Sequence, residues 1–322
     1  LGCSHKNVFK FKDFSKINFD DLLSKVDLRV NDNNRKQLSK THNWNSISNN
    51  ILNILLATST IGVLAISATF VIGSGGLDLS LGSVMGLSGV VGAYMAVNMG
   101  LPAVFGVIGC IGAGAIAGFV NGQLVTRAFV PAFIVTLGML GLARGLGLVI
   151  SDGRVIYGLP SGLLYLGQGR PLGIPMPVII LLTTALVTHY ILAFTRFGRY
   201  TLAVGDNENS TRTAGIDVER HRLILYTLSG GLAGLAGMLF MARINSGDPT
   251  AGITYELTAI TAAIIGGTNL FGGRGSILGT MIGALIMGVL QNGLNLLAVQ
   301  SYYQQMAIGA VLIFAVFIDQ YQ

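Results

Sequence analysis

The segment 195-TRFGRYTLAVGDNENSTRTAGIDVERHR-222 is a strongly charged interruption in an otherwise apolar sequence. It contains five arginines and four acidic residues, and apolar runs of membrane-spanning length lie on both sides of it. A segment this polar cannot lie in lipid, because its backbone and charged groups would lose water without replacement. Since arginine-rich connections stay in the cytoplasm, the sequence predicts a membrane protein whose loop 195–222 faces the cytoplasm.

The composition supports a membrane body that has no nucleotide site of its own. The chain has 322 residues, of which 52% are hydrophobic and only 11% are charged, whereas soluble domains are about 25% charged. All seven lysines lie at or before Lys40, so a GxxxxGK[ST] phosphate-binding loop is excluded from the rest of the chain. If ATP is used, another chain must hydrolyse it. The net charge of +6 favours an anionic membrane surface, and without a basic stripe interleaved with aromatics it does not indicate nucleic acid.

Two regions are expected. Residues 1–49 are a hydrophilic tail, in which Asn18 begins a short amphipathic helix that extends to Val30. Residues 50–322 are the transmembrane domain, and they contain the loop 195–222.

The transmembrane domain contains nine apolar segments. Eight of them approach the roughly 20 residues that a helix needs to cross a bilayer, and glycines on the third, sixth and eighth predict close helix contacts. The seventh is short, so it is expected to be a half-helix or a re-entrant piece that lines a cavity. The fold class is therefore an all-α polytopic membrane protein of about nine membrane segments with short broken helices. The segments are Ile54–Gly73, Leu77–Met99, Leu101–Val120, Pro131–Ile150, Met176–Phe194, Leu223–Met241, Glu256–Asn269, Ser276–Leu297 and Tyr302–Ile318.

The first group of candidate pathway residues surrounds a single acid. Asp78 is the only acidic residue between Asp32 and Asp152, and it lies between two apolar segments together with Ser80 and Ser83. These side chains can cap the backbone N–H groups that begin a helix. Alternatively, Asp78 takes part in the solute pathway or in its gating, because an acid within the membrane is costly without a function.

The second group consists of three amides on the eighth segment. The spacing of Gln291, Asn292 and Asn295 by three and four residues places them on one helix face. Amides in a helix bundle bond to neighbouring helices, but they also match the hydroxyls of a neutral polyol or sugar. The sequence leaves both alternatives open.

Within the charged loop, the sequence predicts a small self-capped helix. Asp206 is expected to cap a helix over Asn207–Ala214, and Gly215 stands where a left-handed residue ends it. Glu208 and Arg212 form an i, i+4 pair in the favoured orientation. A plain connection between antiparallel helices needs only a few residues, so the projection is interpreted as a docking surface for a soluble partner.

Six stretches together resemble the permease subunits of ribose-type sugar ABC importers, from about Trp44 to the last residue. The resemblance implies a complex in a bacterial inner membrane, with two permease chains (identical or different), a two-domain ATPase that binds the ATP, and a sugar-binding protein outside. It implies no cofactor in this chain, and it identifies Asn207–Gly215 as the coupling helix that sits in a cleft of the ATPase. The stretches are GLDLSLGS at 76–83, GRPLGIPMP at 169–177, GDNENSTRTAG at 205–215, PTAG at 249–252, GGTNLFGGRGS at 266–276 and QNGLNLL at 291–297.

The sequence departs from this family in two places. Such permeases have about ten membrane helices and begin with one more before the segment that follows Asn50, whereas residues 1–49 are hydrophilic. Counted back from a cytoplasmic loop, nine spans put the lysine-rich tail outside, against the positive-inside rule. A helix is then missing, a segment does not fully span, or the tail is not native to the family. The family also has alanines where this chain has Asn209 and Ser210, which lowers the helix propensity of the coupling helix.

Two other classes of protein remain as alternatives. An ATP-independent secondary transporter or channel needs its own ion or proton site, for which the spans offer only Asp78, Arg144 and Glu256. A membrane enzyme needs a catalytic motif, and HExxH, GxSxG and metal-spaced Cys/His/Asp clusters are absent from the sequence.

Overall fold

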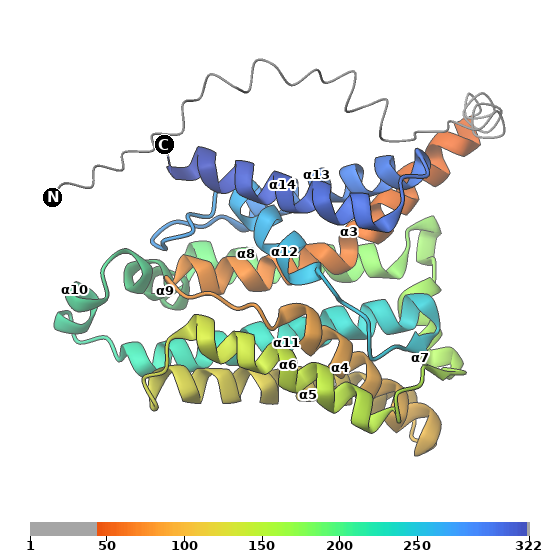
Figure 1. Cartoon of the computed structure of the whole chain (residues 1–322), viewed down its shortest axis with the longest axis horizontal. Helices are drawn as coiled ribbons and strands as arrows, with labels where there is room; N and C mark the ends of the chain where they lie inside the picture. The colour runs from red at the N-terminus through yellow and green to blue at the C-terminus, as the bar shows by residue number, and fades with distance from the viewer. Residues whose placement is uncertain (1–43, 321–322) are drawn as a thin grey trace, which may run out of the picture.

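The computed structural model describes residues 44–320, and nearly all of their regular structure is helical (Figure 1). Two-residue strands, β1 (Ile156–Tyr157) and β2 (Ser246–Gly247), pair antiparallel. The all-α fold class is confirmed. The amphipathic helix expected at 18–30 lies outside the described residues.

The helices follow one another with short connections. The chain runs through α3 (Trp44–Gly73), α4 (Leu81–Ala93), the π-helical turn η3 (Tyr94–Asn98), α5 (Ala103–Thr126), α6 (Ala132–Ile150), α7 (Ser161–Gln168), the 3-10 turn η4 (Pro171–Gly173), α8 (Met176–Phe194), α9 (Arg196–Asp206), α10 (Glu208–Thr213), α11 (Val218–Ile244), α12 (Tyr255–Ile265), α13 (Ile277–Leu296) and α14 (Ser301–Gln320).

Seven apolar helices among the described residues are long enough to cross a membrane. The apolar helix Tyr255–Ile265 is shorter, and α14, with 20 residues, contains the apolar stretch Ser301–Phe317. The half-helix predicted for the seventh segment is confirmed, since α12 has only 11 residues. The second segment is also broken. Its helix begins at Leu81, so residues 77–80, which the sequence analysis placed in this segment, are not helical.

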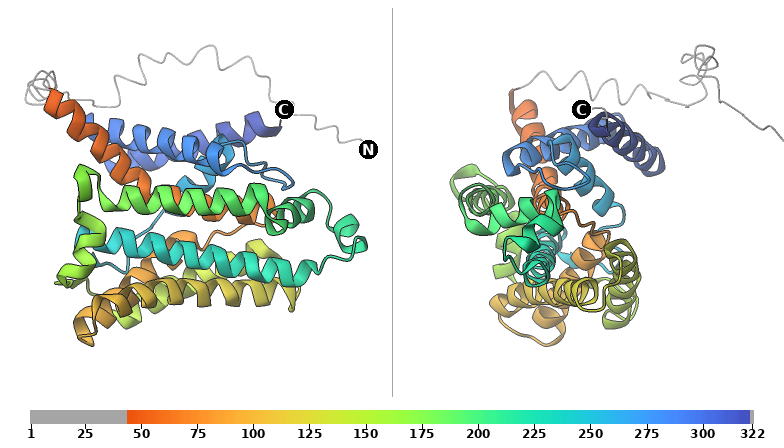
Figure 2. Two further views of the ribbon diagram at one scale, coloured as in Figure 1. Left: turned by 180° about the vertical axis from the view of Figure 1, so that it is seen from behind. Right: turned by 90° about the vertical axis from the view of Figure 1, so that its left-hand side faces the viewer.

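Three helices form the centre of the bundle. In the most apolar stretch of each helix, the share of buried residues is 78% for α3, 72% for α4 and 61% for α11, against 28% for α5 and α6. Seen from one end, α8, the α5–α6 pair and the α13–α14 pair surround them (Figure 2). The outer helices expose large apolar side chains, as lipid-facing helices do.

Glycines allow a close helix crossing between α5 and α11. A Cβ atom on Gly114 or Gly118 would collide with the backbone of α11, and a Cβ atom on Gly230 or Gly234 would collide with the backbone of α5. Small residues allow this approach, which gains van der Waals contact where lipid supplies no hydrophobic force between helices. The close contacts expected for the third and sixth segments are confirmed.

Helices α4 and α12 both begin in the interior of the bundle, and the non-helical segments that precede them enter from opposite ends. Residues 74–80 lead from the α10 end into the middle, where α4 starts, and residues 248–254 lead in from the other end to α12 (Figure 1). The two starting points touch, because a Cβ on Gly82 would meet the carbonyl of Gly252 and the carboxylate of Glu256. Non-helical backbone at this depth is tolerated only where protein or a water-filled cavity surrounds it.

Candidate functional site

The charged loop folds into two helices instead of one. Residues 196–206 form α9, so Asp206 is the last residue of that helix and cannot cap the next one. The chain is extended at Asn207, with φ −154° and ψ 103°, and its side-chain oxygen accepts a 2.9 Å hydrogen bond from the N–H of Ser210. The N-cap expected at Asp206 is therefore wrong by one residue. Gly215 has φ +85° and its N–H donates to the Arg212 carbonyl, which confirms the predicted stop.

An ion-pair network ties α10 to the first turns of α11. Arg212 pairs with Glu208 at 3.1 Å, as predicted, and also with Glu219 at 2.5 Å. Arg222 pairs with the second oxygen of Glu208 at 2.8 Å. Hydrogen bonds from Arg212 to Glu219 and then to Glu208 raise the pKa of this guanidinium above its usual value, so it stays charged at any physiological pH. The pairs to Glu219 and Arg222 were missed in the sequence because they cross a turn.

Further contacts connect the α9–α10 projection to the bundle. The Thr211 hydroxyl donates to the Ala203 carbonyl at 2.8 Å, and the Thr201 hydroxyl lies 3.1 Å from Nε2 of His221 on α11. At the end of α9, a Cβ on Gly205 would collide with the backbone at Gly73, the last residue of α3, and with the backbone of Gly273. These contacts join α9 and α10 to α11 and to the end of α3.

Asp78 is buried at a point where four helices meet. One of its oxygens accepts hydrogen bonds from the Ser80 N–H at 2.9 Å and the Ser80 hydroxyl at 2.6 Å, and the other accepts from the Ser229 hydroxyl of α11 at 3.2 Å. Ser229 is bonded to Ser67 of α3, and Asn121 of α5 donates to the Ser80 hydroxyl. Asp78 therefore closes a turn before α4 and links it to its neighbours.

The capping expected from the two serines is not observed. Ser80 is the N-cap of α4 but makes no side-chain cap hydrogen bond. Its hydroxyl is occupied by Asp78, and the Ser83 hydroxyl donates back to the Ser80 carbonyl at 2.9 Å.

Arg144 of α6 binds the non-helical segment 248–254 that precedes α12. Its Nη1 donates to the carbonyls of Pro249 and Ala251 at 2.6 and 2.7 Å. These bonds satisfy backbone acceptors in a non-helical stretch, which is the requirement for such a stretch at membrane depth.

The three amides line one polar cavity of about 400 Å³. Gln291, Asn292 and Asn295 face it from α13, so the shared face predicted from their spacing is confirmed. Asn292 donates to Asn50, and Asn295 accepts from Gln304. Asp78, Ser80 and Ser83 do not line this cavity, so the two groups of candidate pathway residues are separate. The remaining lining residues are Asn53, Leu56, Ala57, Arg243 and Tyr255.

Sequence reasoning missed Arg243 and Tyr255 in this cavity. Arg243 lies in the last turn of α11 and Tyr255 is the first residue of α12. A signal was present, since Arg243 is a cation at the end of an apolar segment, followed closely by the break before α12.

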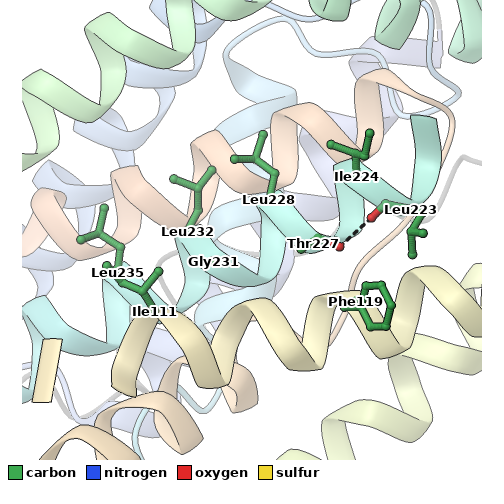
Figure 3. A pocket seen from close by; sticks show the side chains of 9 residues that line it. All are labelled: Ile111, Phe119, Leu223, Ile224, Thr227, Leu228, Gly231, Leu232 and Leu235. Carbon is green, nitrogen blue, oxygen red and sulfur yellow. Dashed lines mark hydrogen bonds between the residues drawn. The ribbon is translucent and has the colours of Figure 1, made fainter. Parts of the chain in front are cut away.

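A second hollow, between α5 and α11, has the opposite character (Figure 3). It has a volume of about 580 Å³ and an apolar lining that includes Ile111, Phe119 and Leu228. Its one polar side chain, Thr227, donates to the carbonyl of Leu223 on its own helix (Figure 3). Such a surface suits lipid chains and not a hydrated solute, so the amide-lined cavity is the better candidate for solute binding.

Broken helices that meet inside a bundle, a polar cavity and a charged helical projection define a membrane transport permease. The sequence profile described as "Branched-chain amino acid transport system / permease component" matches residues 50–316. The chain belongs to this family.

Named relatives are sugar permeases. The chain is 45% identical over 275 residues to the "Ribose import permease protein RbsC" of Escherichia coli (strain K12), covering 84% of this chain and 85% of the relative. It is 40% identical over 273 residues to the "D-allose transport system permease protein AlsC" of the same strain, covering 85% and 84%. It is 38% identical over 276 residues to the "Fructose import permease protein FrcC" of Rhizobium meliloti, covering 83% and 77%. No solved structure was found to match the chain.

Proposed function

We propose that this protein is the transmembrane subunit of an ABC importer that carries a monosaccharide, ribose or a similar sugar, across a bacterial plasma membrane. The amide-lined cavity is the observation that carries the proposal. Amides offer both donors and acceptors to hydroxyl groups, and none of the lining residues that the structure describes is acidic. The ammonium group of an amino acid would find no carboxylate partner there, so a sugar fits better than the amino acids in the family description.

A separate ATPase subunit supplies the energy by docking on α10. Closure of the ATPase pushes on α10, and the ion pairs of Glu208, Arg212 and Arg222 transmit the displacement to α11. Since α11 carries Arg243 into the cavity, ATP binding at the partner then favours one state of the cavity over the other. The complete complex also contains a second permease chain and an external sugar-binding protein.

The test is sugar uptake by the whole complex. The chain is co-expressed with its own ATPase and binding protein, and uptake of radiolabelled ribose, allose, fructose and arabinose is measured in cells. We expect uptake of at least one sugar, and its loss when the phosphate-binding lysine of the ATPase is replaced. Uptake that survives this replacement would instead establish the ATP-independent transporter or channel.

A further inference from the structure

Arg243 is held in a fixed position at the wall of the amide-lined cavity. Its Nη1 donates to the carbonyl of Leu56 on α3 at 3.0 Å. Its guanidinium carbon lies 5.7 Å from the centre of the Phe240 ring, and that ring meets Tyr255 edge-on at 5.9 Å. A cation stacked near an aromatic face and bonded on one side has little rotational freedom.

The charge of Arg243 is not compensated by the described part of the cavity. Among the residues that the structure describes, Arg243 makes no ion pair with a carboxylate, and the cavity lining contains amides, a tyrosine, a leucine and an alanine besides the arginine. A guanidinium has five N–H donors and no acceptor, and the bond to Leu56 uses one of them. The cavity thus presents a net positive, donor-rich wall to whatever enters it.

We propose that Arg243 selects the solute by charge and orients it by hydrogen bonding. Its planar pair of N–H groups donates to two adjacent oxygens of the solute, a geometry that a single ammonium cannot reproduce. The solutes that fit are neutral sugars with neighbouring hydroxyls and their carboxylate derivatives, whereas amino sugars are repelled. The identity of the solute rests on the function proposed above, but the charge selection does not.

The first experiment measures the electrostatic field of the cavity without any sugar. In the intact complex, Cys3 and Cys110 are replaced by serine, and Ala57→Cys places a reporter thiol in the cavity. Its reaction rates with a sulfonate-bearing and a trimethylammonium-bearing methanethiosulfonate are compared. Opposite unit charges about 5 Å apart change a rate about fourfold in bulk water and over a hundredfold at an effective dielectric of about 20.

We therefore expect Arg243→Gln to lower the anion-to-cation rate ratio by at least about tenfold. Arg243→Lys is expected to preserve the ratio, as is the control Arg170→Gln, which removes a cation outside the cavity. An unchanged ratio in Arg243→Gln would overturn the proposal. So would a thiol that reacts with neither reagent, because the cavity would then be closed to solutes.

The second experiment separates charge from geometry through transport. In the complex that takes up ribose, we expect both Arg243→Gln and Arg243→Lys to raise the KM by about tenfold or more, as expected for the loss of a bidentate charge-assisted contact. The amount of chain in the membrane is measured in parallel. If Arg243→Lys preserves the anion-to-cation rate ratio of the thiol but raises the KM, Arg243 orients the solute and its role is not merely structural. If the wild-type complex takes up no sugar, the proposed function fails while the thiol result stands. If the wild-type complex takes up a sugar, an unchanged KM in Arg243→Gln refutes the proposed role of Arg243 and leaves the proposed function intact.

Discussion

At the scale of single residues, Asp78 shows how an acid is kept inside this bundle. It is 3% exposed and accepts three hydrogen bonds from two serines. Each buried donor left unpaired costs about 1–3 kcal/mol. The carboxylate is thus integral to the meeting point of α3, α4, α5 and α11, and its geometry favours the structural alternative over direct solute contact.

Replacement of Asp78 by leucine tests this interpretation. We expect Asp78→Leu to destabilise the protein by about 2 kcal/mol or more, because the Ser80 N–H and the Ser229 hydroxyl lose their acceptor. Asp78→Asn retains an oxygen for Ser80 and should cost less. Thermal unfolding in detergent, followed by size-exclusion chromatography, measures the difference. Ser83→Ala is the matched control, since it removes a single bond to the Ser80 carbonyl. Equal unfolding temperatures for Asp78→Leu and wild type would contradict the prediction.

The amide at 292 makes a prediction about substrate use. Asn292→Leu replaces a cavity-lining donor and acceptor with an apolar group, and a site built to bond hydroxyls loses discrimination when one partner is removed. We expect the relative uptake of ribose, allose and fructose to change, while stimulation of the ATPase by the binding protein is retained. Ile282→Leu, on the exposed face of the same helix, is the control. An unaltered uptake profile would remove Asn292 from the solute site.

At the scale of elements, α10 is a short helix whose position matters more than its stability. Exposed ion pairs contribute only about 0.2–1 kcal/mol each, and the side chains of Glu208 and Arg212 are 38% and 50% exposed. The interlocked pairs to Glu219 and Arg222 nevertheless join α10 to the first turns of α11. We propose that their contribution is to coupling between the subunits of the importer.

Two substitutions in α10 should uncouple the transporter. Glu208→Arg places a third cation beside Arg212 and Arg222, and Gly215→Val forces a β-branched residue to φ +85°. We expect either change to lower uptake by about tenfold or more, within the usual range of coupling energies. ATP hydrolysis and membrane insertion should persist. Uptake and ATPase rates in proteoliposomes measure this, with Arg154→Gln as the control. Normal uptake in both variants would argue against docking at α10.

The elements also show what a single sequence can predict. Local sequence patterns were enough to predict four features, because periodicity and composition are local properties. These are the charged loop, the half-helix α12, the glycine contacts and the common face of Gln291, Asn292 and Asn295. The cap was misplaced at Asp206 because Asp206 and Asn207 are adjacent and are equally good N-cap residues, and only the end of α9 at Asp206 shows that Asn207 caps α10. Arg243 and Tyr255 could not be assigned to the amide cavity, since only the packing of α3, α11, α12 and α13 brings them together.

At the scale of the whole molecule, the arginines of the membrane domain indicate an orientation. The α5–α6 turn, α9, α10 and the loop from α12 to α13 lie at one end of the bundle, and the first turns of α3 lie at the other (Figure 1). The first end carries most of the arginines of the membrane domain, which the positive-inside rule assigns to the cytoplasm. These are Arg127, Arg196, Arg199, Arg212, Arg220, Arg222 and Arg274.

This orientation predicts which surfaces a membrane-impermeant thiol reagent can reach. In a chain without Cys3 and Cys110, Arg154→Cys should react in intact cells, because it follows α6 at the end opposite α10. Asn209→Cys, exposed on α10, should react only in inside-out vesicles. Both thiols should react fully in detergent, which serves as the control for accessibility. Labelling of Asn209→Cys in intact cells would reverse the orientation, and a cytoplasmic ATPase could then not dock on α10.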